Sequence, residues 1–182
     1  MNKIHTAEDL IAAVNEYGVL PFWTLREQAI NTNEFVYGKF VNKKATFVSK
    51  EVFPYLAALR RDGYDFDSLT DEGKAPRREV EIMNAVGDKP TPSYTLGKSL
   101  QMKGFDGAVT SLQNKTYLCL NFKKSAMGTA LLCRPEDVFG YDYVRGKYSL
   151  TPQENAAELL RLAKGLYEFD KKTRDKILSP AI

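Results

Sequence analysis

The side chains in this sequence best suited to binding chemistry are lysines, gathered in the segment 91–134. This segment carries six lysine or arginine residues against the single acid Asp106, whereas the whole chain has a net charge of +3. Such a concentration favours a phosphate-rich partner, because ammonium groups displace the counterions of a nucleic-acid backbone. The residues expected to contact phosphates are Lys98, Lys103, Lys115, Lys123 and Lys124.

A second polar group follows Asp106, which is expected to cap a helix. Gly107, Thr110, Ser111 and Asn114 recur at helical spacing, so they share one side of that helix. Small polar side chains can approach a DNA groove closely and form hydrogen bonds with base edges. This face has no arginine, which argues against strong direct base readout, and a purely structural role is the alternative. The residues expected to face base edges are Thr110, Ser111, Gln113 and Asn114.

Signatures of catalysis and of metal binding are mostly missing. His5 is the only histidine, so a serine or cysteine nucleophile has no other histidine as its base. Cys119, Cys133 and His5 cannot complete a four-ligand zinc shell without carboxylates, and the acidic run 62–72 lacks the spacing of a calcium loop. The sequence therefore predicts no catalytic residue, no metal and no cofactor, and it leaves open whether the chain is an enzyme.

The elements that must position these side chains follow the order of a winged helix. Two apolar strands, 116–122 and 129–133, predict a hairpin, or wing, with a basic tip. Three short helices precede this hairpin. Capping residues and apolar periodicity predict that these helices start at Pro76, at Ser93 or Thr95, and at Asp106.

The rest of the chain predicts an α+β protein with additional elements on both sides of the winged helix. An N-terminal helix, a hairpin over 35–48 and a second helix that ends at Gly63 come first. The acidic, turn-rich run 62–72 is the expected boundary. We therefore expect an N-terminal helix, hairpin and helix in 1–70, the winged helix in 71–134, and a packing segment with helices in 135–182.

Composition is that of an ordinary globular protein, with 182 residues of which 43% are hydrophobic and 27% charged. No apolar run approaches the roughly 18 residues of a membrane helix, and the first ten residues lack the apolar core of a signal peptide. We therefore expect a cytoplasmic protein without membrane contact. The two cysteines are expected to be small core residues, and the oligomeric state is left open.

Several blocks of the sequence resemble a group of bacterial proteins called AlkZ-related. These blocks are residues 37–67, 107–120 and 134–144, and WTLRE at 23–27 is similar to the group's W-x-W-R-E block. The resemblance spans residues 18 to 178 approximately. The group is in turn distantly similar to the alkylpurine DNA glycosylases of the AlkZ/YcaQ type. Those enzymes are built from winged-helix units and a β-barrel, and they hydrolyse the N-glycosidic bond of an alkylated purine.

The resemblance implies a link to DNA repair, but it transfers no catalytic residue. The glycosylases use a Gln-x-Gln or Gln-x-Asp motif near the N-terminus to position water, whereas Gln28 here is followed by Ala29 and Ile30. Gln113-Asn114-Lys115 has lysine in place of the second polar acceptor. The leading prediction is a duplex DNA-binding protein. A DNA glycosylase and a protein-interaction module without nucleic acid are the alternatives.

Overall fold

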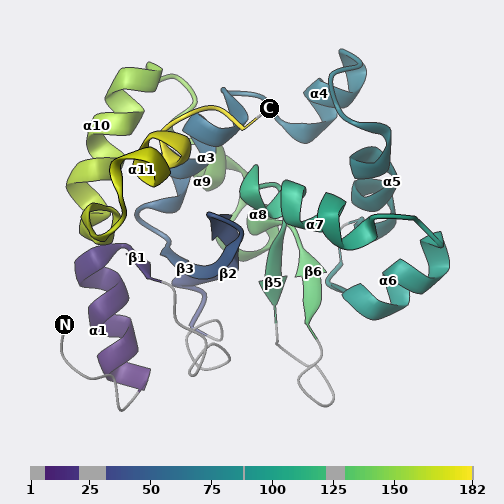
Figure 1. Cartoon of the computed structure of the whole chain (residues 1–182), viewed down its shortest axis with the longest axis horizontal. Coiled ribbons are helices and arrows are strands. Elements are labelled where there is room, and N and C mark those ends of the chain that lie inside the picture. Colours follow the sequence, from purple (N-terminus) through teal and green to yellow (C-terminus); the bar gives the residue numbers. More distant parts are fainter. Residues whose placement is uncertain (1–6, 21–31, 88, 122–129, 182) are drawn as a thin grey trace.

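The protein has an α+β fold built on one antiparallel sheet, as predicted for the fold class. The computed structural model describes residues 7–20, 32–87, 89–121 and 130–181. Within this part of the chain the sheet has six strands in the order β1-β3-β2-β5-β6-β4. In Figure 1, α1, α10 and α11 lie to the left of the sheet, and α5 and α6 lie to its right.

The N-terminal elements form one edge of the sheet and two of its covering helices. β2 and β3 form the hairpin predicted over residues 35–48, and β1 pairs with β3. The turn residues Asn42 and Lys43 have φ values of 47° and 58°, the left-handed conformation of a tight hairpin turn. The elements are α1 (Ala7–Tyr17), β1 (Val19–Leu20), β2 (Phe35–Val41), β3 (Lys44–Ser49) and α3 (Phe53–Arg61).

The middle of the chain contains three helices and two paired strands close to their predicted positions. A short strand that the sequence did not indicate, β4, pairs with β6. Within the run 62–72, the expected boundary, residues 66–71 form the helix α4, in which Phe66 and Leu69 lie one turn apart and are both buried. The elements are α4 (Phe66–Asp71), α5 (Arg77–Val86), β4 (Thr91–Pro92), α6 (Ser93–Leu100), α7 (Phe105–Asn114), β5 (Cys119–Asn121) and β6 (Leu131–Cys133).

The C-terminal segment consists of helices, as expected. Thr151 and Glu154 form a capping box at the start of a helix, in which the Thr151 backbone N–H donates to Glu154 Oε2 at 2.8 Å. Asp170 caps the last helix by accepting a hydrogen bond of 2.9 Å from the Thr173 backbone N–H. The elements are α8 (Pro135–Phe139), α9 (Tyr141–Arg145), α10 (Pro152–Leu162), the 3-10 helix η2 (Lys164–Glu168) and α11 (Lys171–Ile177).

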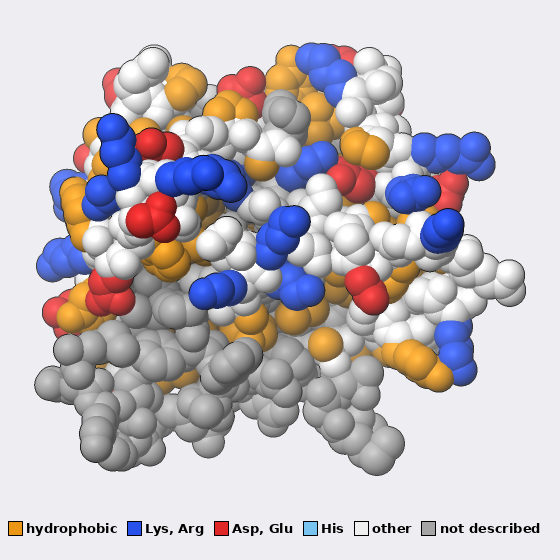
Figure 2. All heavy atoms as spheres, viewed as in Figure 1, with side chains coloured by type: hydrophobic (Ala, Val, Ile, Leu, Met, Phe, Trp, Pro, Cys, Tyr) orange, Lys and Arg blue, Asp and Glu red, His pale blue; other side chains and the backbone are white. Residues whose placement is uncertain are grey.

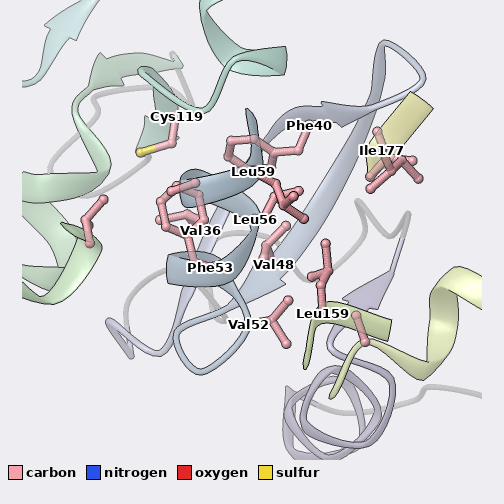
Figure 3. Close-up of a cluster of buried hydrophobic side chains, with 14 of the residues drawn as sticks. Val36, Phe40, Val48, Val52, Phe53, Leu56, Leu59, Cys119, Leu159 and Ile177 are labelled. Atoms are coloured by element: carbon pink, nitrogen blue, oxygen red, sulfur yellow. The ribbon is translucent and has the colours of Figure 1, made fainter. Parts of the chain in front are cut away.

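Side chains of β2 alternate between two hydrophobic clusters, so both faces of the sheet are covered there. Val36 and Phe40 pack with α3 and with the C-terminal helices α10 and α11 (Figure 3), whereas Phe35 and Tyr37 pack with α1. A third cluster joins α4, α5, α6 and α7 to β6. β2 also pairs with β5 at Tyr37 and Leu120, so the sheet continues across the predicted boundary near residue 70. The three-part division remains a prediction.

A candidate nucleic-acid interface

The helix α7, which carries the residues expected to face base edges, packs against β2 and α5. Gln113 is only 2% exposed, and its Oε1 accepts a hydrogen bond of 2.8 Å from the Lys39 backbone N–H. Ser111 Oγ donates to Glu79 Oε1 at 2.7 Å, and Thr110 Oγ1 accepts from Lys39 Nζ at 3.2 Å. Gln113 therefore does not face solvent, contrary to expectation, because β2 satisfies its buried amide.

The five predicted phosphate contacts divide into three situations. Lys98 and Lys103 are exposed on α6 and on the segment after it. Lys115 is held by an ion pair, with its Nζ 3.0 Å from Glu79 Oε2 and both side chains largely buried. Lys123 and Lys124 lie outside the described residues. Lys115 is therefore paired within the protein. Of the described lysines predicted to contact phosphates, only Lys98 and Lys103 are exposed to solvent.

A different set of basic side chains gathers around a hollow of about 810 Å³. This hollow is lined by the β2–β3 turn, the C-terminal end of α7 and the helix α11. Asp175 is the one acidic residue among its described lining residues. The basic residues that line it are Lys43, Arg60, Lys171, Lys172 and Lys176.

A second hollow, of about 530 Å³, continues the first along α7. Lys43 and Asn114 line both hollows, and the second adds Lys39, Thr110 and Ser111. Figure 2 shows lysine and arginine side chains over the middle of this face, where α11, the β2–β3 turn and α7 meet in Figure 1. We call the two hollows together the basic groove. Its basic residues are Lys39, Lys43, Arg60, Lys171, Lys172 and Lys176.

The floor of the basic groove contains a buried positive charge, Arg60. Its guanidinium is bound by neutral oxygens: Nε donates to the Asn114 carbonyl at 3.1 Å, and Nη1 donates to the carbonyls of Lys176 and Ser179. Nη2 donates to Asn114 Oδ1. Arg60 thus caps the C-terminal ends of α7 and α11, where the helix dipole favours a cation.

No carboxylate within the described chain forms an ion pair with Arg60, which is 5% exposed. Burial lowers the pKa of Arg60 to about 10, so the guanidinium stays protonated at neutral pH. The buried charge of Arg60 therefore adds to the field of the lysines that line the same hollow. Such a field raises the local concentration of anions.

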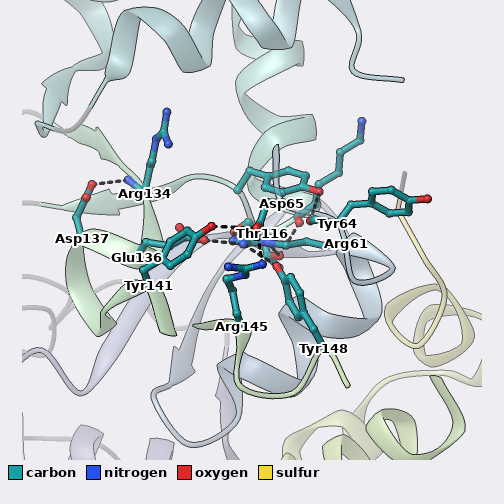
Figure 4. Close-up of polar contacts among 12 residues, drawn as sticks. Arg61, Tyr64, Asp65, Thr116, Arg134, Glu136, Asp137, Tyr141, Arg145 and Tyr148 are labelled. Atoms are coloured by element: carbon teal, nitrogen blue, oxygen red, sulfur yellow. Dashed lines mark hydrogen bonds and ion pairs between the residues drawn. The ribbon is translucent and has the colours of Figure 1, made fainter. Parts of the chain in front are cut away.

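The neighbouring Arg61 is also buried, but a carboxylate compensates its charge. Its Nη1 lies 2.5 Å from Glu136 Oε1 and donates to the Tyr148 hydroxyl at 3.0 Å, while Nη2 donates to the Thr116 carbonyl at 2.6 Å (Figure 4). The guanidinium also lies 4.6 Å from the centre of the Tyr117 ring. Arg61 therefore joins α3 to α8 and to the segment after α7, away from the basic groove.

A smaller hollow of about 230 Å³ beside Arg61 is lined by four acidic residues, but three of these have cationic or hydrogen-bonding partners. Asp65 Oδ2 is 3.0 Å from Arg145 and also accepts from the Tyr141 hydroxyl, and Glu136 is paired with Arg61. The third, Asp137, accepts from a backbone N–H. Within the described residues, no group of three or more His, Cys, Asp or Glu could hold a metal ion. Three of the four carboxylates in this hollow are therefore already bound by neighbouring groups.

The sequence missed this site because its basic residues come from segments far apart in the chain. The turn Asn42-Lys43-Lys44 and the lysines of α11 are separated by more than a hundred residues. Each segment alone looks like an ordinary solvated surface. The only available signal was that both are rich in lysine, and that signal does not place them on one face.

The fold and the groove define the class of protein: an α+β chain with one sheet and a concave basic surface. A family model described as AlkZ related matches residues 22–179, so the chain belongs to the AlkZ-related family. This confirms the resemblance seen in the sequence. No curated protein and no solved structure matched the chain. In the described part of the chain, no helix has the length and apolar character needed to cross a lipid bilayer.

Proposed function

We propose that this protein binds the phosphate backbone of duplex DNA along the basic groove. The observation that carries the proposal is the basic groove itself, which is lined by five lysines and by the buried Arg60. Lysines at this density neutralise several phosphates at once. Membership of the AlkZ-related family supports a role in DNA repair or maintenance.

We also infer that the segment from α5 to β6 is a winged helix. The order α5, β4, α6, α7, β5, β6 is that of the motif, and β4 pairs with β6, which pairs with β5. In helix-turn-helix relatives the corresponding helix enters the major groove. Here one side of α7 packs against β2. Beside it, the basic groove is lined by Thr110, Ser111 and Asn114. These three residues would therefore contact the DNA from the side of α7.

The affinity of the proposed binding depends little on the base sequence of the DNA. Contacts to phosphates position a protein on DNA, whereas contacts to base edges determine its sequence preference. The basic groove offers ammonium groups and short polar side chains, and its one arginine is committed to Asn114, Lys176 and Ser179. We expect similar affinities for unrelated duplexes of the same length.

The test is fluorescence anisotropy with a labelled duplex at several salt concentrations. Five lysines that each neutralise a phosphate give a slope of roughly −4 to −5 for log affinity against log salt. Lys172→Glu is expected to weaken binding, and Lys164→Glu, an exposed lysine outside the groove, is the control with the same change of charge. Absence of binding at low salt, or equal effects of the two variants, contradicts the proposal.

A second candidate function is excision of alkylated bases, supported by the family membership alone. Gln28, the one glutamine in the first forty residues, lies outside the described residues. The activity predicts release of free base from methylated duplex DNA. Intact DNA after prolonged incubation, in a sample that binds the same duplex, would leave DNA binding as the function.

A further inference from the structure

A third hollow extends the basic groove onto α6. It has a volume of about 560 Å³, and Asp106 lines both this hollow and the groove. Its character differs, because two aromatic rings contribute to its wall. The two rings belong to Tyr94 and Phe105, and the other lining residues are Ser93, Gly97, Lys98, Asp106 and Ala130.

Tyr94 is the most accessible large hydrophobic side chain in the described part of the protein, with 68% of its surface exposed. Lys98 follows one turn later on α6, and its Nζ lies 4.5 Å from the centre of the Tyr94 ring. Even with this neighbour, most of the Tyr94 ring remains open to a partner. An aromatic ring beside a cation is therefore presented at the end of a basic surface.

The second ring, Phe105, packs closely against Gly97 of α6. A Cβ atom added at Gly97 would lie 3.2 Å from the Phe105 ring, so the absence of a side chain lets α6 approach the start of α7 closely. Phe105 itself is largely buried. The hollow thus combines a largely buried ring, Phe105, with the exposed ring of Tyr94.

We infer that this hollow takes an unpaired nucleobase of the nucleic acid whose backbone follows the basic groove. The inference rests on the proposed function. Proteins that hold single strands combine a basic groove with exposed aromatic side chains, because every base has a face on which such a ring can stack. In a blunt duplex both faces of each internal base are covered by neighbouring bases. Away from the duplex ends, stacking on Tyr94 therefore requires an unpaired base, with Lys98 placed to meet the adjoining phosphate.

The experiment compares a blunt duplex with a duplex that carries a short single-stranded overhang and the same total number of phosphates. The overhang contains 2-aminopurine, whose fluorescence is quenched by stacking. We expect the wild-type protein to bind the overhang duplex more tightly and to quench the probe. Tyr94→Ala should weaken overhang binding about fivefold or more, abolish quenching and leave blunt-duplex binding unchanged.

Two variants separate stacking from other effects. Tyr94→Phe keeps the ring and should retain the preference for the overhang. Tyr167→Ala removes another exposed tyrosine, 60% accessible and 5.7 Å from Arg174, that lines none of the three hollows; it should change nothing. Equal, salt-dependent binding of both DNAs overturns this inference alone, as does an equal loss for both DNAs in Tyr94→Ala. Absence of binding to either DNA overturns the proposed function and this inference with it.

Discussion

At the scale of single residues, the ion pair of Arg61 with Glu136 is expected to contribute strongly to stability. Removing one partner of a buried pair leaves the other charge without compensation, which costs about 3–5 kcal/mol. Arg61→Ala should lower the free energy of unfolding by that amount, measured by urea denaturation. Arg77→Ala is the control, because the Arg77 side chain is 91% exposed and its pair with Glu81 should contribute less than about 1 kcal/mol. Equal losses in the two variants would contradict the argument.

The two cysteines allow a second prediction at the same scale. Cys119 and Cys133 are fully buried cross-strand partners with their sulfur atoms 3.3 Å apart. Burial, followed by the hydrogen bond with Cys133, raises the pKa of the Cys119 thiol well above its usual value. Because a reagent must reach the sulfur atom and both side chains are fully buried, neither thiol should react with an aromatic disulfide reagent at neutral pH until the protein is unfolded. Rapid labelling of the native protein would show that the strands open readily.

At the scale of elements, the start of α10 should make stability depend on pH. Hydrogen bonds from the Thr151 backbone N–H and then from its hydroxyl lower the pKa of Glu154 below its usual 4.5. The unfolded chain therefore takes up this proton more readily than the folded chain. The contribution of the carboxylate is complete above the unfolded pKa and is lost as pH falls through the folded pKa.

The measurement is the melting temperature of wild type and Glu154→Gln between about pH 7 and about pH 3. The wild type should be the more stable at neutral pH, and the difference should shrink in acid. The same change at Glu168, exposed in η2, provides the control. A difference that stays constant across the pH range would mean that the capping carboxylate does not titrate as argued.

Elements whose causes are local could be predicted from the sequence, whereas those with distant causes could not. The start of α10 follows from Thr151 and Glu154, which are three residues apart. By contrast, α4 forms where Phe66 can pack against Tyr117, with ring centres 5.2 Å apart. Gln113 is buried where its Oε1 accepts a hydrogen bond from the backbone N–H of Lys39, which lies 74 residues earlier in the chain. Periodicity alone does not reveal such partners.

At the scale of the whole molecule, the arrangement of charge differs from its distribution along the sequence. The sequence concentrates positive charge in 91–134, but the fold pairs Lys115 with Glu79. It also brings Lys43, of the β2–β3 turn, beside the lysines of α11. The basic groove thus joins the N-terminal, middle and C-terminal parts of the chain, and it exists only when all three are folded together.

This arrangement predicts which lysines determine the dependence of DNA binding on salt. Replacing Lys171, Lys172 and Lys176 of α11 by glutamine should make the slope of log affinity against log salt shallower by roughly three units, since each lost phosphate contact removes about 0.9. Lys115→Gln should leave the slope unchanged, because Glu79 holds that ammonium in the folded protein. A variant with both Lys98→Gln and Lys103→Gln should change the slope by less than the α11 variant does. If the α11 variant keeps the wild-type slope while the Lys98 and Lys103 changes abolish it, the DNA follows α6, and the basic groove is not the phosphate-binding surface.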